Sequence, residues 1–98
     1  MLDPQRSDLT IGVLGAGTMG RGIAQVSAVS GMSVRFFDTN TEQLNKAVEF
    51  IGGMMVRAAE KGRMSAEDAK AATDRIQIVD SLQGFADCHV VVEAIIEN

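Results

Sequence analysis

The segment from Ile11 to Gly20 reads Ile-Gly-Val-Leu-Gly-Ala-Gly-Thr-Met-Gly, so a short β-branched run leads into glycines spaced G-x-G-x-x-G. The residues before Gly15 have the pattern of a buried strand, and those after Gly17 have the spacing of a helix. Asp38 follows 18 residues after Gly20 and closes a second strand-like run. A glycine turn in this context, answered by an acid about 20 residues later, is the fingerprint of an adenine dinucleotide site.

Each glycine of this turn has a separate predicted role. Gly15 permits the tight turn, Gly17 lets a pyrophosphate approach the backbone, and Gly20 lets the helix pack closely on the strand. The backbone N–H groups of Thr18 and Met19, in the first helical turn, are expected to donate to the pyrophosphate. The turn therefore contributes the candidate cofactor-binding residues Gly15, Ala16, Gly17, Thr18, Met19 and Gly20.

Asp38 completes this predicted site, because its carboxylate would accept hydrogen bonds from the adenosine ribose. The carboxylate would also repel the 2′-phosphate of NADP, and the following Thr39 and Asn40 supply no cation to offset it. The sequence thus favours NAD over NADP, while FAD fits the same physics.

Strand and helix patterns alternate along the rest of the chain. Strands are predicted at residues 9–14, 32–37, 76–79 and 89–94, with helices from Gly17 to a Gly31 cap, from Thr39 or Asn40 to Gly62, and from Ser65 to Asp74. In the first helix, Met19, Ile23 and Val26 form the predicted apolar face, with Ala24 and Ala28 beside them. Gly52-Gly53 predicts a bend or a close packing contact in the second helix. The apolar run at 89–94 predicts a strand buried on both faces.

These elements predict an α/β fold, a Rossmann-type doubly wound parallel sheet with strand order 3-2-1-4 and a helical hairpin between strands 2 and 3. The complete fold has six strands, so we expect an incomplete domain at 9–98 after an N-terminal tail at 1–8. The fourth strand would then have an open edge, which suggests a fragment or an edge covered by another copy.

Composition limits the classes of partner. The 98 residues carry a net charge of −4 without a basic run, which argues against nucleic acid as a partner. The longest apolar stretches fall short of the roughly 18 residues of a membrane span, and the N-terminus lacks a signal core. A single cysteine, Cys88, fits a reducing compartment, so we expect a cytoplasmic protein.

Two segments resemble the N-terminal NAD-binding domain of the 3-hydroxyacyl-CoA dehydrogenases. These are Gly15-Ala-Gly-Thr-Met-Gly-Arg-Gly-Ile-Ala-Gln-Val26 and Val91-Val-Glu-Ala-Ile-Ile-Glu-Asn98, of which the second is the more discriminating. The resemblance covers Leu9 to Asn98 and includes the helical hairpin.

The resemblance implies an oxidoreductase that interconverts (S)-3-hydroxyacyl-CoA and 3-oxoacyl-CoA with NAD, in a homodimeric parent enzyme. It places Ala94 and Glu97 beside the nicotinamide ribose, and Lys61 in contact with the CoA of the substrate. A serine that accompanies this lysine in the family is Met54 here, so CoA contact is only partly supported. The catalytic residues of the family lie beyond position 98, so none is assigned and the fragment alone is expected to be inactive.

Other readings of these residues stay open. The chain could be a stand-alone NAD-binding module without catalysis, or belong to another hydroxyacid dehydrogenase. Lys61 and Glu97 could be ordinary surface residues. His89, Cys88 and Glu93 are interpreted as structural rather than catalytic, and no metal site is predicted.

Overall fold

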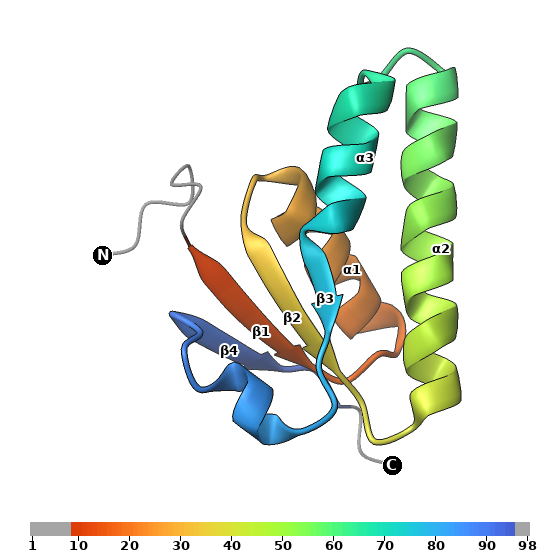
Figure 1. Cartoon of the computed structure of the whole chain (residues 1–98). Helices are drawn as coiled ribbons and strands as arrows, with labels where there is room; N and C mark the ends of the chain where they lie inside the picture. The colour runs from red at the N-terminus through yellow and green to blue at the C-terminus, as the bar shows by residue number, and fades with distance from the viewer. Residues whose placement is uncertain (1–8, 96–98) are drawn as a thin grey trace.

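The structure is a computed structural model that describes residues 9–95. Its centre is a four-stranded sheet of β1 (Thr10–Leu14), β2 (Ser33–Phe37), β3 (Ile76–Ile78) and β4 (Val90–Glu93), in the order β3-β2-β1-β4. All neighbouring strands run parallel, with Ile11 opposite Val34 on one side and Val90 on the other. The predicted fold class and strand order are confirmed (Figure 1).

Three helices connect the strands: α1 (Thr18–Val29), α2 (Thr41–Glu60) and α3 (Ala66–Asp74). The Asn40 side chain caps α2 by accepting from the Gln43 N–H, and Ser65 caps α3 in the same way by accepting from the Asp68 N–H. Of the two predicted starts for α2, the structure uses Asn40. As predicted, α2 and α3 form a hairpin between β2 and β3, and it extends beyond the sheet (Figure 1).

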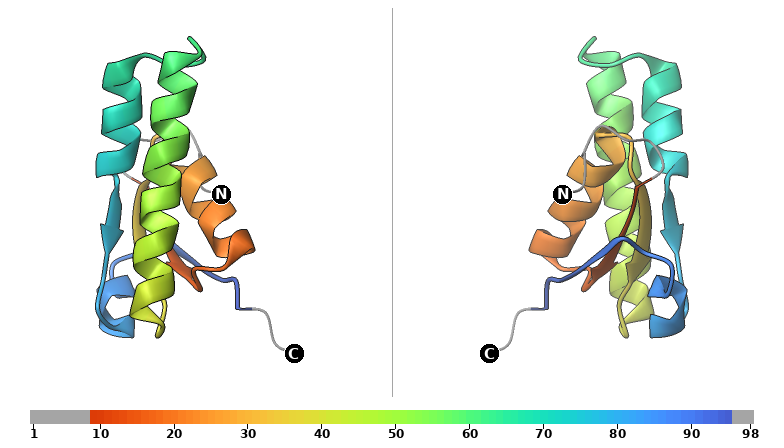
Figure 2. Two further views of the ribbon diagram at one scale, coloured as in Figure 1. Left: turned by 90° about the vertical axis from the view of Figure 1, so that its right-hand side faces the viewer. Right: turned by 90° about the vertical axis from the view of Figure 1, so that its left-hand side faces the viewer.

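The core lies between the sheet and these helices, which pack together on one face of the sheet (Figure 2). Val13, Phe36 and Ile51 are completely buried there. On the opposite face, a 3₁₀ helix, η1 (Leu82–Phe85), covers β1, and a side chain at Gly12 would overlap the ring of Phe85. The sequence analysis did not predict η1, because four residues carry too little periodicity.

The predicted apolar face of α1 is partly wrong. Met19 and Val26 are 56% and 66% exposed, whereas Ala24 and Ala28 are buried as predicted, together with Gly20 and Ser27, and Ile23 packs partly buried against the core. Small side chains on the buried face let α1 approach the sheet closely.

The prediction that the fourth strand is buried on both faces is also wrong. Val90 and Val91 remain 41% and 50% exposed, and β4 pairs with β1 alone among the described strands. An apolar sequence shows that a strand can be buried, but whether it is buried depends on the elements that pack against it. The remaining edge of β4 is open in the described part of the chain, as expected.

Of the bend or close packing contact expected at Gly52-Gly53, the close packing contact is absent. The helix α2 runs without interruption from Thr41 to Glu60, and outside the adjacent helix backbone no atom lies within 4 Å of a Cβ position at either glycine. Within residues 9–95, no helix combines the length and the apolar character needed to cross a membrane.

Candidate functional site

The glycine turn joins β1 to α1 at the carboxyl edge of the sheet. Gly15 has a φ of +110°, a conformation that L side chains rarely adopt. A Cβ on Gly20 would overlap the carbonyl oxygen of Gly15, so α1 could not pack against the turn with any other residue there. Two of the three predicted glycine roles, the turn and the close helix approach, therefore have a direct steric basis.

Gly17 has a different environment. The nearest atom to a Cβ at this position is Nε2 of Gln43, at an ordinary contact distance of 3.5 Å, and φ is −75°. The folded chain therefore does not itself demand glycine here, and a Cβ would project into open space in front of the turn. This observation fits the predicted approach of a ligand to the backbone.

Gly17 is also the N-cap of α1 and provides no side chain to bond the first-turn N–H groups. In this respect α1 differs from α2 and α3, which Asn40 and Ser65 cap. The first turn of α1 contains no acidic residue. Its N–H groups and the positive end of the helix dipole are therefore suited to an external anion.

Asp38 is tied to this turn across 22 residues of sequence. Its Oδ2 accepts a hydrogen bond from the Ala16 N–H at 2.7 Å, and its Oδ1 accepts one from the Asn40 N–H, also at 2.7 Å. Each carboxylate oxygen has a second lone pair, so both can still accept from a ribose hydroxyl. Asp38 thus fixes the glycine turn to the end of β2 while it remains available to a ligand.

Two cavities meet at the turn. A cavity of about 280 Å³ lies at the edge of the sheet and is lined by Gly15, Gly17, Asp38, Thr39, Gln43, Ala94 and Ile95. A larger one, of about 620 Å³, lies between α1 and α2, with Gly17, Thr18, Arg21, Gln43, Lys46 and Phe50 in its lining. Gly17 and Gln43 line both cavities. The first brings together the glycine turn, the acid and the end of the fourth strand, which are features expected of a nucleotide site, while Thr18 of the same turn lines the second.

Ala94 lies next to the glycine turn, at the carboxyl end of β4. It is buried, its N–H donates to the Leu14 carbonyl at 2.7 Å, and its Cβ lies 3.5 Å from a Cβ position at Gly20. Lys61 is not brought there: it is the exposed C-cap of α2, 18 residues and about 27 Å of helix beyond Gln43. Glu97 lies outside the described residues.

The sequence analysis missed Arg21, Gln43 and Phe50 in the lining of these cavities. Arg21 follows the last glycine of the turn directly, and its guanidinium carbon lies 3.7 Å from the centroid of the Phe50 ring. Gln43 and Phe50 are seven residues apart on α2 and therefore share one face of the helix. That spacing was visible in the sequence, but the pairing with α1 depends on the fold.

His89 has a structural place. Its Nδ1 accepts from the Thr10 N–H at 3.0 Å, and its own N–H donates to the Thr10 carbonyl at 2.8 Å. The side chain therefore joins the start of β4 to the start of β1, as the structural interpretation of this histidine predicted.

Cys88 is half-buried beside Phe85, and burial raises the pKa of its thiol. The Arg35 guanidinium acts in the opposite direction on this pKa, with a smaller effect. Arg35 also pairs with Asp87 at 3.2 Å and thereby lowers the pKa of that carboxyl. A thiol with a raised pKa is a poor nucleophile, which fits the interpretation of Cys88 as structural.

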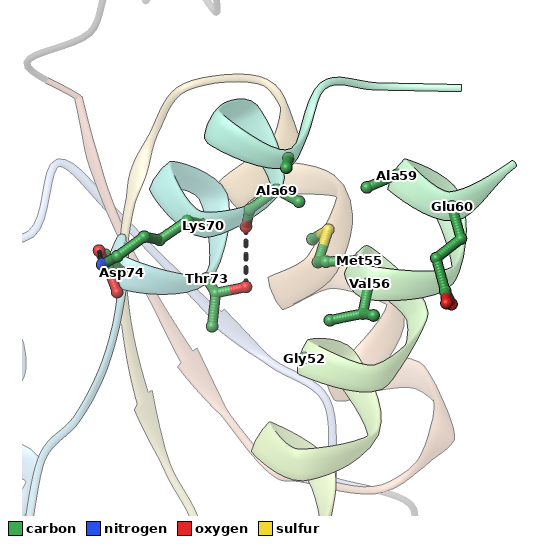
Figure 3. A pocket seen from close by; sticks show the side chains of 10 residues that line it. Gly52, Met55, Val56, Ala59, Glu60, Ala69, Lys70, Thr73 and Asp74 are labelled. Atoms are coloured by element: carbon green, nitrogen blue, oxygen red, sulfur yellow. Dashed lines mark hydrogen bonds and ion pairs between the residues drawn. The ribbon is translucent and has the colours of Figure 1, made fainter. Parts of the chain in front are cut away.

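A separate apolar groove of about 610 Å³ lies between α2 and α3, away from the glycine turn (Figure 3). Three of the polar side chains that line it have partners: Lys70 pairs with Asp74 at 2.8 Å, and the Thr73 hydroxyl donates to the Ala69 carbonyl at 2.9 Å. Residues 9–95 contain no cluster of His, Cys, Asp and Glu side chains that could hold a metal ion.

Comparison with protein families matches residues 10–98 to the 3-hydroxyacyl-CoA dehydrogenase, NAD binding domain. A probable 3-hydroxybutyryl-CoA dehydrogenase of Deinococcus radiodurans is 42% identical over 90 residues, which are 92% of this chain and 32% of that protein. A probable 3-hydroxybutyryl-CoA dehydrogenase of Bacillus subtilis is 39% identical over 86 residues, 88% of this chain and 30% of that protein. The chain thus spans about a third of the length of these relatives.

Solved structures agree. The crystal structure of 3-hydroxybutyryl-CoA dehydrogenase from Escherichia coli K12 superimposes with a TM-score of 0.88 at 32% identity, covering 93% of this chain and 19% of that one. The (S)-3-hydroxybutyryl-CoA dehydrogenase from Ralstonia eutropha gives 0.85 at 35% identity, covering 91% and 31%. The similarity extends over nearly all of the chain in sequence and in structure.

Proposed function

The chain belongs to the 3-hydroxyacyl-CoA dehydrogenase family, as its NAD-binding domain, and from this premise we propose that it binds NAD for the interconversion of (S)-3-hydroxyacyl-CoA and 3-oxoacyl-CoA. The observation that carries the proposal is the coupling of Asp38 to the glycine turn through Ala16. It joins the acid and the turn in one cavity, and these are the two features that an adenine dinucleotide needs.

In the proposed complex, the N–H groups of Thr18 and Met19 donate to the pyrophosphate, and the missing side chain of Gly17 leaves room for it. Asp38 accepts from the ribose hydroxyls of the adenosine. Ala94 lies at the end of β4, where the nicotinamide half of the cofactor would lie. Glu97 is proposed to lie beside the nicotinamide ribose on the same side. The bound cofactor would supply the hydride acceptor.

The residues of this chain therefore bind and orient the cofactor. This chain matches about a third of the length of its relatives. We assign the proton transfer of the family reaction to residues in the part of the relatives that it does not match. We propose a cytoplasmic, homodimeric enzyme as the context of this domain, with Lys61 on the hairpin contacting the CoA of the substrate. The exposed position of Lys61 is compatible with such a contact.

The test is a calorimetric titration of the 98-residue protein with NADH and with NADPH. We expect NADH to bind and NADPH to bind at least about tenfold more weakly, because the Asp38 carboxylate opposes a 2′-phosphate. Absence of NADH binding would contradict the proposed function. Equal affinity for the two cofactors would contradict the role of Asp38 in choosing between them.

A further inference from the structure

We propose that the cavity between α1 and α2 is a second anion site, in which Arg21, held on the ring of Phe50, binds a phosphate group of a nucleotide ligand. The cavity has a volume of about 620 Å³ and adjoins the cofactor cavity, with Gly17 and Gln43 lining both. Its size lies within the range of small-molecule sites.

The stacked geometry of Arg21 suits this role. The guanidinium lies 3.7 Å from the centroid of the Phe50 ring, so its planar face is occupied by the aromatic surface. The N–H donors of a guanidinium lie in its plane, and stacking leaves them free to bond a phosphate in a fork. Stacking also orders a side chain that would otherwise lose conformational freedom on binding.

Phe50 is 43% exposed, so its ring is accessible from the cavity that it lines. Phe50 lines the cavity and carries the Arg21 guanidinium on its ring, and this contact accounts for the exposed position of the ring. Phe50 therefore acts as a positioning residue for the guanidinium.

The charges around the cavity favour an anion. Arg21 and Lys46 both line it, and the one acid in its lining, Glu42, is paired with Lys46 at 3.0 Å. Both side chains of that ion pair are more than two-thirds exposed, so the pair is weak and can rearrange around a ligand. Within residues 9–95, no carboxylate lies within ion-pair distance of Arg21.

Two sources could supply the phosphate: the pyrophosphate of NAD, which would extend from the neighbouring cavity past Gly17, or the phosphates of a CoA thioester. Both sources are ligands of the proposed function, on which this inference rests. Both present the same chemistry to Arg21, and separate titrations distinguish them.

The experiment titrates the 98-residue protein with NADH, with CoA, and with pantetheine, which lacks the phosphates. The variants are Arg21→Gln, which removes the charge, Arg21→Lys, which keeps the charge without the planar fork, and Phe50→Leu, which removes the stacking ring. Arg63→Gln is the matched control, because Arg63 is an exposed arginine outside the cavity. Circular dichroism checks that each variant is folded.

We expect Arg21→Gln to weaken the binding of CoA or of NADH about tenfold, with a smaller loss in Arg21→Lys and Phe50→Leu and none in Arg63→Gln. The ligand that is weakened identifies the source, and pantetheine should not bind measurably. Unchanged affinity for both ligands in a folded Arg21→Gln variant overturns the proposal, as does a wild-type protein that binds neither. A wild-type protein that binds CoA through Arg21 but does not bind NADH supports the second site and contradicts the proposed function instead.

Discussion

The carboxylate of Asp38 accepts a 2.7 Å hydrogen bond from the backbone N–H of Ala16, in the middle of the glycine turn. The same carboxylate accepts from the Asn40 N–H at the start of α2. One acidic side chain therefore holds the end of β2, the turn after β1 and the N-terminus of α2 in a fixed arrangement. Its structural and ligand-binding roles are coupled, and substitutions should affect both.

Replacement of Asp38 by Asn should lower NADH affinity and stability together. An amide has one acceptor oxygen, so its NH₂ group would face one of the two backbone N–H donors. We expect about a tenfold loss of NADH affinity and a loss of about 1–2 kcal/mol in the free energy of unfolding, in line with hydrogen bonds to charged groups. Calorimetry and urea denaturation measure the two effects. Asp80→Asn, at an exposed acid outside the cavities, is the control. Unchanged stability in Asp38→Asn would show that the contact with Ala16 contributes nothing.

The glycines at positions 17 and 20 should respond to alanine in opposite ways. In Gly17→Ala the new Cβ makes an ordinary contact with Gln43, so stability should change by less than about 0.5 kcal/mol while NADH binding falls strongly. In Gly20→Ala the Cβ overlaps the Gly15 carbonyl, and we expect a loss of about 3 kcal/mol or more. Urea denaturation and NADH titration separate the two. Gly22→Ala, with no atom within 4 Å of its Cβ position, should be as stable as the wild type or more so.

The boundaries of the elements could be predicted from sequence because their signals are local. Asn40 and Ser65 cap helices through N–H groups three residues away, and Gly15 ends a strand within one turn. The strand order followed from the fingerprint, because that motif belongs to one type of parallel sheet.

The features that sequence reasoning did not predict depend on partners distant in the chain. The exposure of Met19 and Val26 on α1 was missed because periodicity is judged from large apolar residues, whereas the side of α1 that packs on the sheet is built from small ones such as Ala24. The stacking of Arg21 on Phe50 joins two helices, and neither residue type specifies the other. In the candidate site, the turn and Asp38 could be recognised, whereas the second cavity beside them could not.

The paired glycines in α2 should be replaceable by alanine with a gain in stability. Gly52 and Gly53 lie within a continuous helix, and outside the adjacent helix backbone no atom lies within 4 Å of either Cβ position, so a methyl group meets no obstacle. Each replacement should add about 0.5–1 kcal/mol through backbone entropy. For a domain of this size, each kcal/mol corresponds to a rise of about 4–8 °C in the Tm, measured by thermal denaturation. A lower Tm in both variants would mean that these positions serve a contact which alanine disturbs.

The pair formed by Arg35 and Asp87 should make stability depend on pH in the acid range. The Arg35 side chain donates hydrogen bonds to both oxygens of Asp87 and lowers the pKa of this carboxyl below its usual value. Because the folded state lowers this pKa, the pair contributes stability above the ordinary titration range of an aspartate, and that contribution is lost as the pH falls through the pKa of Asp87 in the folded state. Arg35→Gln should return the pKa of Asp87 towards its ordinary value, as measured by NMR titration of the carboxyl carbon. Lys46→Gln, which removes a cation from another part of the molecule, should leave the lowered pKa of Asp87 unchanged. If the Asp87 resonance titrated identically in all three proteins, Arg35 could not be the cause of the low pKa.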